Sequence, residues 1–187
     1  MNLYVLRHAN AGTPRKNPTL DAKRPLDKEG KQQCILVANC LNALNVHFDV
    51  IASSPLKRAM QTASLVGMEI GYEAKIHVTD ALSFTGSIAD FHKLVTDLSG
   101  NENVLVVGHN PNLEQFLSSV ITTASATPSA TKEAKSQLGK IRLRKGALAR
   151  VDCTRRPGTL NWLLDPRMLR TLYSSVTKSS RRKTSKK

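Results

Sequence analysis

The sequence predicts an α/β fold: a three-layer sandwich in which a mostly parallel central sheet carries helices on both faces. Two observations predict it. Short apolar runs alternate with longer segments of helical period through most of the 187 residues. A chain of this length can also bury one hydrophobic core and is too short to expect two. We therefore expect a single domain over residues 1–177.

The predicted strands are short apolar segments. Four of them alternate with helix-like segments, which favours parallel pairing; they cover residues 3–7, 50–52, 76–78 and 104–108. Two more, residues 147–152 and 160–163, are predicted to pair with each other, because Arg156-Pro157-Gly158 between them favours a turn. This second group is expected to form an antiparallel edge of the sheet.

The predicted helices follow the strands in order, over residues 28–43, 56–68, 88–98, 112–120 and 166–176. In the first of them Ile35, Ala38, Leu41 and Leu44 recur at three-residue steps, close to the helical period. Two segments lack such a pattern. Residues 122–140 are rich in Ser, Thr and Ala, which is typical of a mobile surface loop. Residues 178–187 are too polar to bury and are expected to be disordered.

The charge is distributed unevenly. The formal net charge is +14, yet residues 1–131 carry as many acidic as basic side chains, so the whole excess lies in residues 132–187. Such an asymmetry informs about partners and solubility, not about the fold. The basic tail, residues 178–187, is either a solvated segment or a docking element for an acidic partner. It lacks the interleaved aromatic residues and the apolar face that favour nucleic-acid or membrane binding.

The cysteine pattern and the hydropathy indicate where the protein works. Cys34, Cys40 and Cys153 lack Cys-x-x-Cys spacing, which favours free thiols in a reducing compartment over disulfides or a zinc site. No stretch approaches the ~18 consecutive apolar residues of a transmembrane helix, and the start of the chain lacks the pattern of a secretory signal. We expect a cytoplasmic protein that holds no metal ion and no other cofactor, since no set of His, Cys, Asp and Glu shows metal-ligand spacing.

Three polar motifs follow predicted strands. Arg7-His8-Ala9 ends the first strand, Ser53-Ser54-Pro55 with Arg58 follows the second, and Gly108-His109-Asn110-Pro111 ends the fourth. The carboxyl ends of parallel strands meet at one edge of a sheet, so these motifs are expected to meet as well. Arginine guanidinium groups bind phosphate oxygens through two parallel hydrogen bonds. The sequence therefore predicts a phosphoryl-binding site formed by Arg7, His8, Arg58 and His109.

The same motifs suggest how the site is charged. Ser54-Pro55 and Asn110-Pro111 each have the pattern of an N-cap residue followed by proline at the first helical position. Two helices would then direct backbone N–H groups toward a bound anion. The neighbouring cations are expected to lower the pKa of His8. A neutral His8 can attack phosphorus, while the arginines and His109 stabilise the developing negative charge.

These motifs resemble the histidine phosphatase (phosphoglycerate mutase-like) superfamily. The resemblance extends in order over residues 3–169 and is closest to the SixA-type phosphohistidine phosphatase branch. Further matching segments are Arg24-Pro25-Leu26, Gly146-Ala147-Leu148-Ala149, Asn161-Trp162-Leu163 and the stretch from Pro166 to Leu169. The resemblance implies a phosphoglycerate mutase-like fold and a metal-independent phosphatase in which His8 becomes a transient phosphohistidine. It also implies substrate contacts from Arg24 and Asn110.

One departure concerns the general acid. Many members of the superfamily carry a glutamate where this chain has Phe84. Phosphoramidates have good leaving groups and need less acid catalysis than alkyl phosphates, so the departure favours phosphohistidine as substrate. Asp80 is the remaining candidate proton donor, with turn capping as its alternative role.

The expected function is therefore hydrolysis of phosphohistidine on a phosphorylated protein of signal transduction. One alternative is a phosphatase or mutase that acts on small phosphate esters. Another is a module that binds phosphoryl groups without turnover.

Overall fold

The computed structural model describes residues 1–122 and 141–174. Apart from Thr122, the predicted loop over residues 122–140 lies outside the described residues, and so does the basic tail over 178–187. The binding of an acidic partner by that tail stays a prediction.

A single six-stranded sheet runs through the described part of the chain, in the order β3-β2-β4-β1-β5-β6. β1, β4, β2 and β3 pair in parallel, whereas β5 is antiparallel to both β1 and β6. The mostly parallel sheet is thus confirmed, and the antiparallel pair lies at one side of it, as predicted. The strands are β1 (Asn2–Arg7), β2 (Val50–Ser53), β3 (His77–Val78), β4 (Asn103–Gly108), β5 (Leu148–Asp152) and β6 (Thr159–Leu164).

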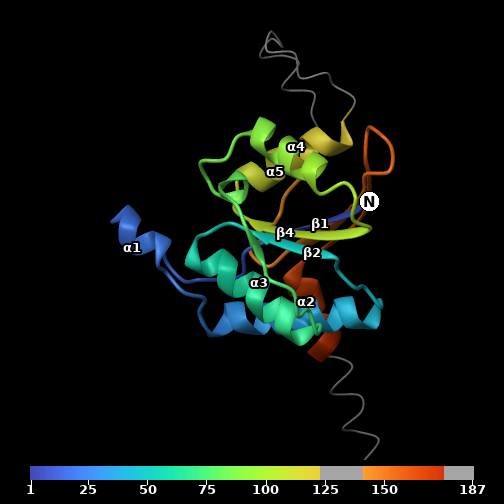
Figure 1. Ribbon diagram of the computed structural model, residues 1–187. Coiled ribbons are helices and arrows are strands. Elements are labelled where there is room, and N and C mark those ends of the chain that lie inside the picture. The colour runs from blue at the N-terminus through green and yellow to red at the C-terminus, as the bar shows by residue number, and fades with distance from the viewer. Residues whose placement is uncertain (123–140, 175–187) are drawn as a thin grey trace, which may run out of the picture.

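Helices cover both faces of this sheet, which confirms the three layers (Figure 1). α2 and α3 lie on one face, and α4 and α5 lie on the other (Figure 1). The bounds are α1 (Pro18–Ala22), α2 (Lys28–Ala43), α3 (Lys57–Glu69), α4 (Ile88–Asp97) and α5 (Asn112–Ile121), with a 3-10 turn η1 (Asp80–Leu82). A further helix starts at Pro166 and extends to the last described residue, Ser174.

α1 was not predicted from the sequence. It is only five residues long and buries none of them, so it leaves no apolar periodicity to detect. The available signal was local: the Asn17 side chain accepts hydrogen bonds from the Thr19 and Leu20 amides, and Pro18 occupies the first helical position.

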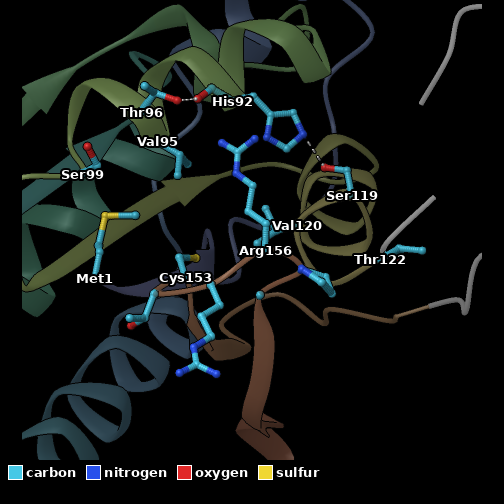
Figure 2. A pocket seen from close by; sticks show the side chains of 14 residues that line it. Met1, His92, Val95, Thr96, Ser99, Ser119, Val120, Thr122, Cys153 and Arg156 are labelled. Atoms are coloured by element: carbon cyan, nitrogen blue, oxygen red, sulfur yellow. Dashed lines mark hydrogen bonds between the residues drawn. The ribbon is translucent and has the colours of Figure 1, made fainter. Parts of the chain in front are cut away.

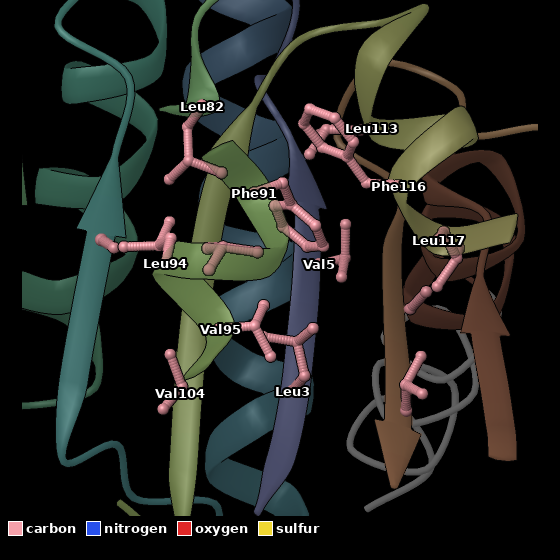
Figure 3. Packing of buried hydrophobic residues seen from close by; sticks show 14 of the residues in the cluster. Leu3, Val5, Leu82, Phe91, Leu94, Val95, Val104, Leu113, Phe116 and Leu117 are labelled. Atoms are coloured by element: carbon pink, nitrogen blue, oxygen red, sulfur yellow. The ribbon is translucent and has the colours of Figure 1, made fainter. Parts of the chain in front are cut away.

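The two faces of the sheet have separate hydrophobic cores. Successive residues of a strand point to opposite faces, so Leu3 and Val5 of β1 enter one core while Tyr4 and Leu6 enter the other. In the first core Phe91 of α4 stacks on Phe116 of α5, with ring centroids 4.3 Å apart. Figure 3 shows these rings above Val5, with Leu3 and Val104 farther along the strands. Burial on both faces explains why the central strands are apolar throughout.

The topology places a switch point between β1 and β4, where a ligand-binding crevice is expected. The two strands are parallel neighbours, yet the chain leaving β1 forms α2 on one face and the chain leaving β4 forms α5 on the other. A ligand-binding crevice forms at the carboxyl ends of the strands where connections diverge in this way. His8 and His109 directly follow these two strand ends.

Two expectations about cellular context concern membranes and thiols. Within residues 1–122 and 141–174, no helix is long and apolar enough to cross a membrane. Cys34, Cys40 and Cys153 are free thiols. A cytoplasmic location stays a prediction.

Candidate active site

His8 is fixed by the strand ends on either side of it. Its backbone N–H donates to the carbonyl of Gly108 at 3.0 Å, and its own carbonyl accepts from the Gly146 amide at 3.2 Å. Gly146 has a φ of +77°, and a Cβ there would lie 2.9 Å from the Gln33 side chain. Glycine is therefore required where the segment before β5 turns past the histidine.

The tautomer of the neutral His8 ring follows from one hydrogen bond. Its Nδ1 lies 2.8 Å from the Ala9 carbonyl oxygen, which can only accept, so Nδ1 carries the proton. In the neutral ring Nε2 then has a free lone pair. The pKa of His8 is lowered to about 3, chiefly by burial and in part by the charges of Arg58, Arg7 and Lys145, against the opposing effect of the Ala9 carbonyl. The sequence indicated this direction from the cations, but burial is the larger cause.

Helices α2 and α3 hold the loop that follows His8. The Ala9 amide donates to the Thr62 hydroxyl at 3.1 Å, and that hydroxyl donates to the Arg58 carbonyl at 2.7 Å. Gly30 of α2 packs directly on the same loop, where a Cβ would lie 1.9 Å from the Asn10 carbonyl oxygen. This close approach leaves the loop little freedom to move.

His109 faces His8 across the crevice. The ring centroids are 4.9 Å apart, and His109 Nε2 lies 2.8 Å from the Ser54 hydroxyl oxygen. Burial lowers the pKa of His109 to about 2, with further contributions from His8, Arg58 and Arg7. Both imidazoles are therefore neutral at pH 7.

Arg7 and Arg58 flank the two histidines, since each guanidinium lowers the pKa of both imidazoles. Arg7 Nη1 donates to the Leu143 carbonyl at 2.8 Å. The Nε atoms of Arg7 and Arg58 and the Nδ1 of His109 are buried, and none has a hydrogen-bond partner within the described residues. A buried polar group without a partner costs about 1–3 kcal/mol. The oxygens of a phosphoryl group are acceptors that match unpaired donors of this kind.

Asp21 of α1 links two arginines. Its carboxylate contacts Arg24 Nε at 2.7 Å and Arg58 Nη1 at 3.2 Å, and its carbonyl accepts from the same Arg58 atom at 3.0 Å. The hydrogen bond from Arg24 is the main reason that the pKa of Asp21 falls to about 2. Arg24 Nη1 in turn donates to the carbonyls of Ala11 and Gly12. Arg24 therefore supports Arg58 through Asp21.

Comparison with known proteins agrees with this geometry. The model of the histidine phosphatase superfamily (branch 1) matches residues 3–83. An uncharacterized protein of Picosynechococcus is 32% identical over 150 residues, which cover 79% of this chain and 87% of that protein. The chain belongs to the histidine phosphatase superfamily. The protein is therefore a phosphatase.

Further likenesses place this phosphatase in the SixA-type branch. Phosphohistidine phosphatase SixA of Escherichia coli (strain K12) is 26% identical over 168 residues, covering 89% of this chain and 94% of that protein. The structure of the protein histidine phosphatase SixA complexed with tungstate superposes with a TM-score of 0.74 at 25% identity, over 90% of this chain and 99% of the other. A putative alpha-ribazole-5'-P phosphatase from Escherichia coli shares the fold, with a TM-score of 0.66 at 19% identity. The superposition covers 89% of this chain and 98% of the other.

The helix caps predicted at Ser54 and Asn110 were wrong. α3 begins at Lys57 and α5 at Asn112, and neither helix has a side-chain cap. Both side chains are engaged elsewhere. Ser54 contacts His109, while Asn110 Nδ2 donates to the Glu114 carboxylate at 2.6 Å and to the Leu143 carbonyl at 2.9 Å. Asn110 thus joins the start of α5 to the segment that precedes β5.

Asp80 lines a depression that includes neither histidine, and Phe84 is exposed. Asp80 is exposed at the start of η1 and lines a separate depression of about 420 Å³ with His77 and Lys93. The Phe84 side chain is 57% exposed, on a loop whose carbonyls accept hydrogen bonds from Asn112. Within the described ranges, no carboxylate forms a hydrogen bond or ion pair with the imidazole of His8 or His109.

Sequence reasoning missed two charged residues of the site. Asp21 had a usable signal, because it precedes Arg24 by three residues, a spacing at which helical side chains meet. Lys145 donates to the Asn10 amide oxygen at 3.0 Å and helps to lower the pKa of His8. It had no signal of its own, since it ends a stretch, residues 140–145, in which basic residues alternate with apolar ones up to Arg144 and Lys145.

Among the residues that the structure describes, no group of three or more His, Cys, Asp and Glu could hold a metal ion. A cavity of about 770 Å³ lies at the opposite ends of the strands, beside Met1 and Cys153 (Figure 2). There His92 contacts the Ser119 hydroxyl at 3.0 Å, and Arg156 extends toward the His92 ring (Figure 2). Six residues of β1, roughly 20 Å, separate this cavity from His8.

The two buried imidazoles predict that acid destabilises the phosphatase. Between pH 6.5 and about 3 the unfolded chain binds protons at these positions and the folded chain does not, so stability falls as the pH falls. Each imidazole is expected to lower the free energy of unfolding by roughly 2 kcal/mol between pH 7 and pH 5. Urea unfolding at the two pH values measures the loss. His109→Asn should remove about half of it, and an unchanged loss in this variant would contradict the assignment.

Proposed function

We propose that this phosphatase hydrolyses phosphohistidine on a phosphorylated protein, through a covalent phosphohistidine intermediate on His8. The observation that carries the proposal is the hydrogen bond from His8 Nδ1 to the Ala9 carbonyl. It leaves the Nε2 lone pair as the nucleophile, beside two arginines and a second neutral histidine. The likeness to Escherichia coli phosphohistidine phosphatase SixA supports the same substrate class.

In the first step His8 Nε2 attacks phosphorus. The N–P bond of the substrate breaks, and the departing imidazole nitrogen takes up a proton from water. Arg7, Arg58 and His109 donate hydrogen bonds to the phosphoryl oxygens; for His109 this requires Ser54 to donate to Nε2, so that Nδ1 carries the proton. The Ala9 carbonyl stabilises the positive charge that forms on the His8 ring.

In the second step water attacks the phosphoryl group of the intermediate. The bond between phosphorus and His8 Nε2 breaks, and inorganic phosphate leaves with the oxygen of that water. The water proton passes to solvent or to phosphate, and His8 returns to its neutral form. The low pKa of His8 favours this neutral form as the leaving group.

The lack of a carboxylate beside the imidazoles supports phosphohistidine over phosphate esters. An ester releases an alkoxide, which needs a proton from a positioned acid, whereas a departing imidazole is readily protonated by water. At the position where many superfamily members carry glutamate, this chain presents the exposed ring of Phe84.

A side-by-side rate comparison tests the substrate class. We expect kcat/KM for a phosphohistidine peptide to exceed that for a phosphoserine peptide of the same sequence by about 10²-fold or more, because only the ester depends on a general acid. Release of inorganic phosphate is measured for both peptides and for a sugar phosphate. A higher kcat/KM on either ester would instead make the protein a phosphatase of small phosphate esters.

A further inference from the structure

A groove of about 520 Å³ leads away from the candidate active site. It is lined by Arg7, by the segment 142–145 that precedes β5, and by Pro166 and Arg167 of the last helix. Among its lining residues, Arg7 Nε and Asn110 Oδ1 are buried atoms without a hydrogen-bond partner in the described residues. The groove therefore adjoins the candidate active site through Arg7, the residue that precedes His8.

Cationic side chains line this groove, and they differ in how they are paired. Arg144 and Arg167 both contact the Asp165 carboxylate, at 3.2 and 2.9 Å. Arg142 is exposed and forms no ion pair or hydrogen bond through its side chain within the described residues. Lys145 bonds the neutral amide of Asn10. Arg142 and Lys145 thus project positive charge that no carboxylate offsets by direct contact.

The two carboxylates of the groove are already engaged. Glu114 accepts from the Asn110 side chain and from the Leu143 amide, at 2.6 and 2.8 Å. Glu29 accepts from Asn10 and lies 4.0 Å from Arg170 outside the groove. The pKa of Lys145 is lowered by burial and then by Arg24 and Arg7, as expected where cations crowd together. Cationic side chains outnumber carboxylates in the lining of the groove, which therefore carries an excess of positive charge.

We propose that this groove binds an acidic segment of the substrate protein, next to the phosphorylated histidine. This inference rests on the proposed function, which it extends from the phosphoryl group to the chain that carries it. With the phosphoryl group between Arg7 and His8, the flanking residues of an extended substrate leave along the groove, past Lys145 and then Arg142. Aspartate or glutamate side chains there complement these charges. Complementarity of this kind raises association rate and specificity more than it raises catalytic rate.

The larger cavity beside Met1 and Cys153 provides a contrast. It too is lined by arginines, Arg155 and Arg156, but it lies roughly 20 Å from His8, at the other ends of the strands. A short segment bound there is too far from the phosphoryl site to adjoin a histidine undergoing hydrolysis. Arg155 is exposed like Arg142 and therefore supplies a matched control for a change of surface charge.

The experiment compares two phosphohistidine peptides that differ only in their flanks, acidic in one and glutamine in the other. The unaltered protein is expected to prefer the acidic peptide by about tenfold in kcat/KM, mainly through KM. Arg142→Glu should abolish this preference and leave hydrolysis of free phosphohistidine unchanged, because Arg142 contacts none of the catalytic residues. Arg155→Glu should preserve the preference. The preference should also shrink between about 0.05 M and about 0.5 M salt.

Each arm reports on one claim. Hydrolysis of free phosphohistidine tests the proposed function alone. If it fails, fluorescence anisotropy of a labelled, unphosphorylated acidic peptide still tests the groove, with the same Arg142→Glu and Arg155→Glu pair. Equal kcat/KM of the unaltered protein on the two peptides would overturn the groove proposal. The groove proposal would also be overturned if Arg142→Glu and Arg155→Glu reduced the preference for the acidic peptide equally.

Discussion

Replacing His8 by alanine is expected to lower phosphohistidine hydrolysis by at least about 10³-fold, because the attacking lone pair is removed. The buried ring lies between the ends of β1 and β4, and its Nδ1 is fixed by the Ala9 carbonyl, so Nε2 is the nitrogen that carries the attacking lone pair. Acid-labile phosphate should be trapped on the unaltered protein after brief mixing with a phosphoryl donor. None should be trapped on the variant.

A second histidine provides the control for this experiment. His92 is partly buried and bonded to Ser119, but it lies at the opposite end of the strands. His92→Ala should keep both turnover and trapping. Full hydrolysis by His8→Ala would refute the covalent mechanism. Phosphate binding by the unaltered protein with no trapping and no turnover would instead favour a module that only binds phosphoryl groups.

Arg58→Ala is expected to lower kcat/KM by about 10²–10³-fold. This is the usual effect of removing one hydrogen-bond donor that stabilises the negative charge of a transition state. Arg58 is buried beside both imidazoles and contributes an unpaired Nε to the site. Arg58→Lys keeps the charge and loses the planar fork, so it should recover only part of the activity. Tungstate affinity should fall in the same order as kcat/KM.

The exposed neighbour Lys57 supplies the matched control, because it lies one residue earlier on α3 and outside the crevice. Lys57→Ala should leave kcat/KM within about threefold of the unaltered protein. The fold should survive Arg58→Ala, since Asp21 keeps its contact with Arg24. Thermal unfolding checks this point. An Arg58→Ala protein that folds and retains full kcat/KM would exclude Arg58 from the phosphoryl site.

The layers of the fold could be predicted because apolar periodicity reports burial. α2 was placed correctly at residues 28–43, and β1 and β4 were placed from short apolar runs. The three-residue period quoted for α2 identified its buried face only in part, because Ala38 and Leu41 are buried whereas Ile35 and Leu44 are exposed. α1 was not predicted because it buries no residue, and a helix without a buried face shows no apolar periodicity. α5 begins at the predicted Asn112, and α3 begins one residue later than predicted, at Lys57. The caps were wrong, because Ser54 and Asn110 turn to tertiary partners.

The candidate site was predictable as far as strand ends determine it. Parallel strands bring their carboxyl ends together, so Arg7, His8 and His109 could be grouped before any coordinates were known. Side-chain direction could not be obtained this way. Whether Arg24 faces a substrate or Asp21 depends on contacts made by α1, and Asn110 is turned by Glu114. The catalytic role of each residue stays a proposal that the variants above decide.

Because α1 has no buried residues, it is expected to open locally from the rest of the fold. With no apolar anchor, α1 is held to the body largely by the ion pairs of Asp21 with Arg24 and Arg58. Local opening of such a segment requires far less free energy than unfolding the sheet. In the proposed function the Arg58 guanidinium serves both partners, since Asp21 engages its Nη1 and its unpaired Nε is offered to the phosphoryl group. If substrate binds Arg58 as proposed, its occupancy and the order of α1 are thermodynamically linked through this one guanidinium.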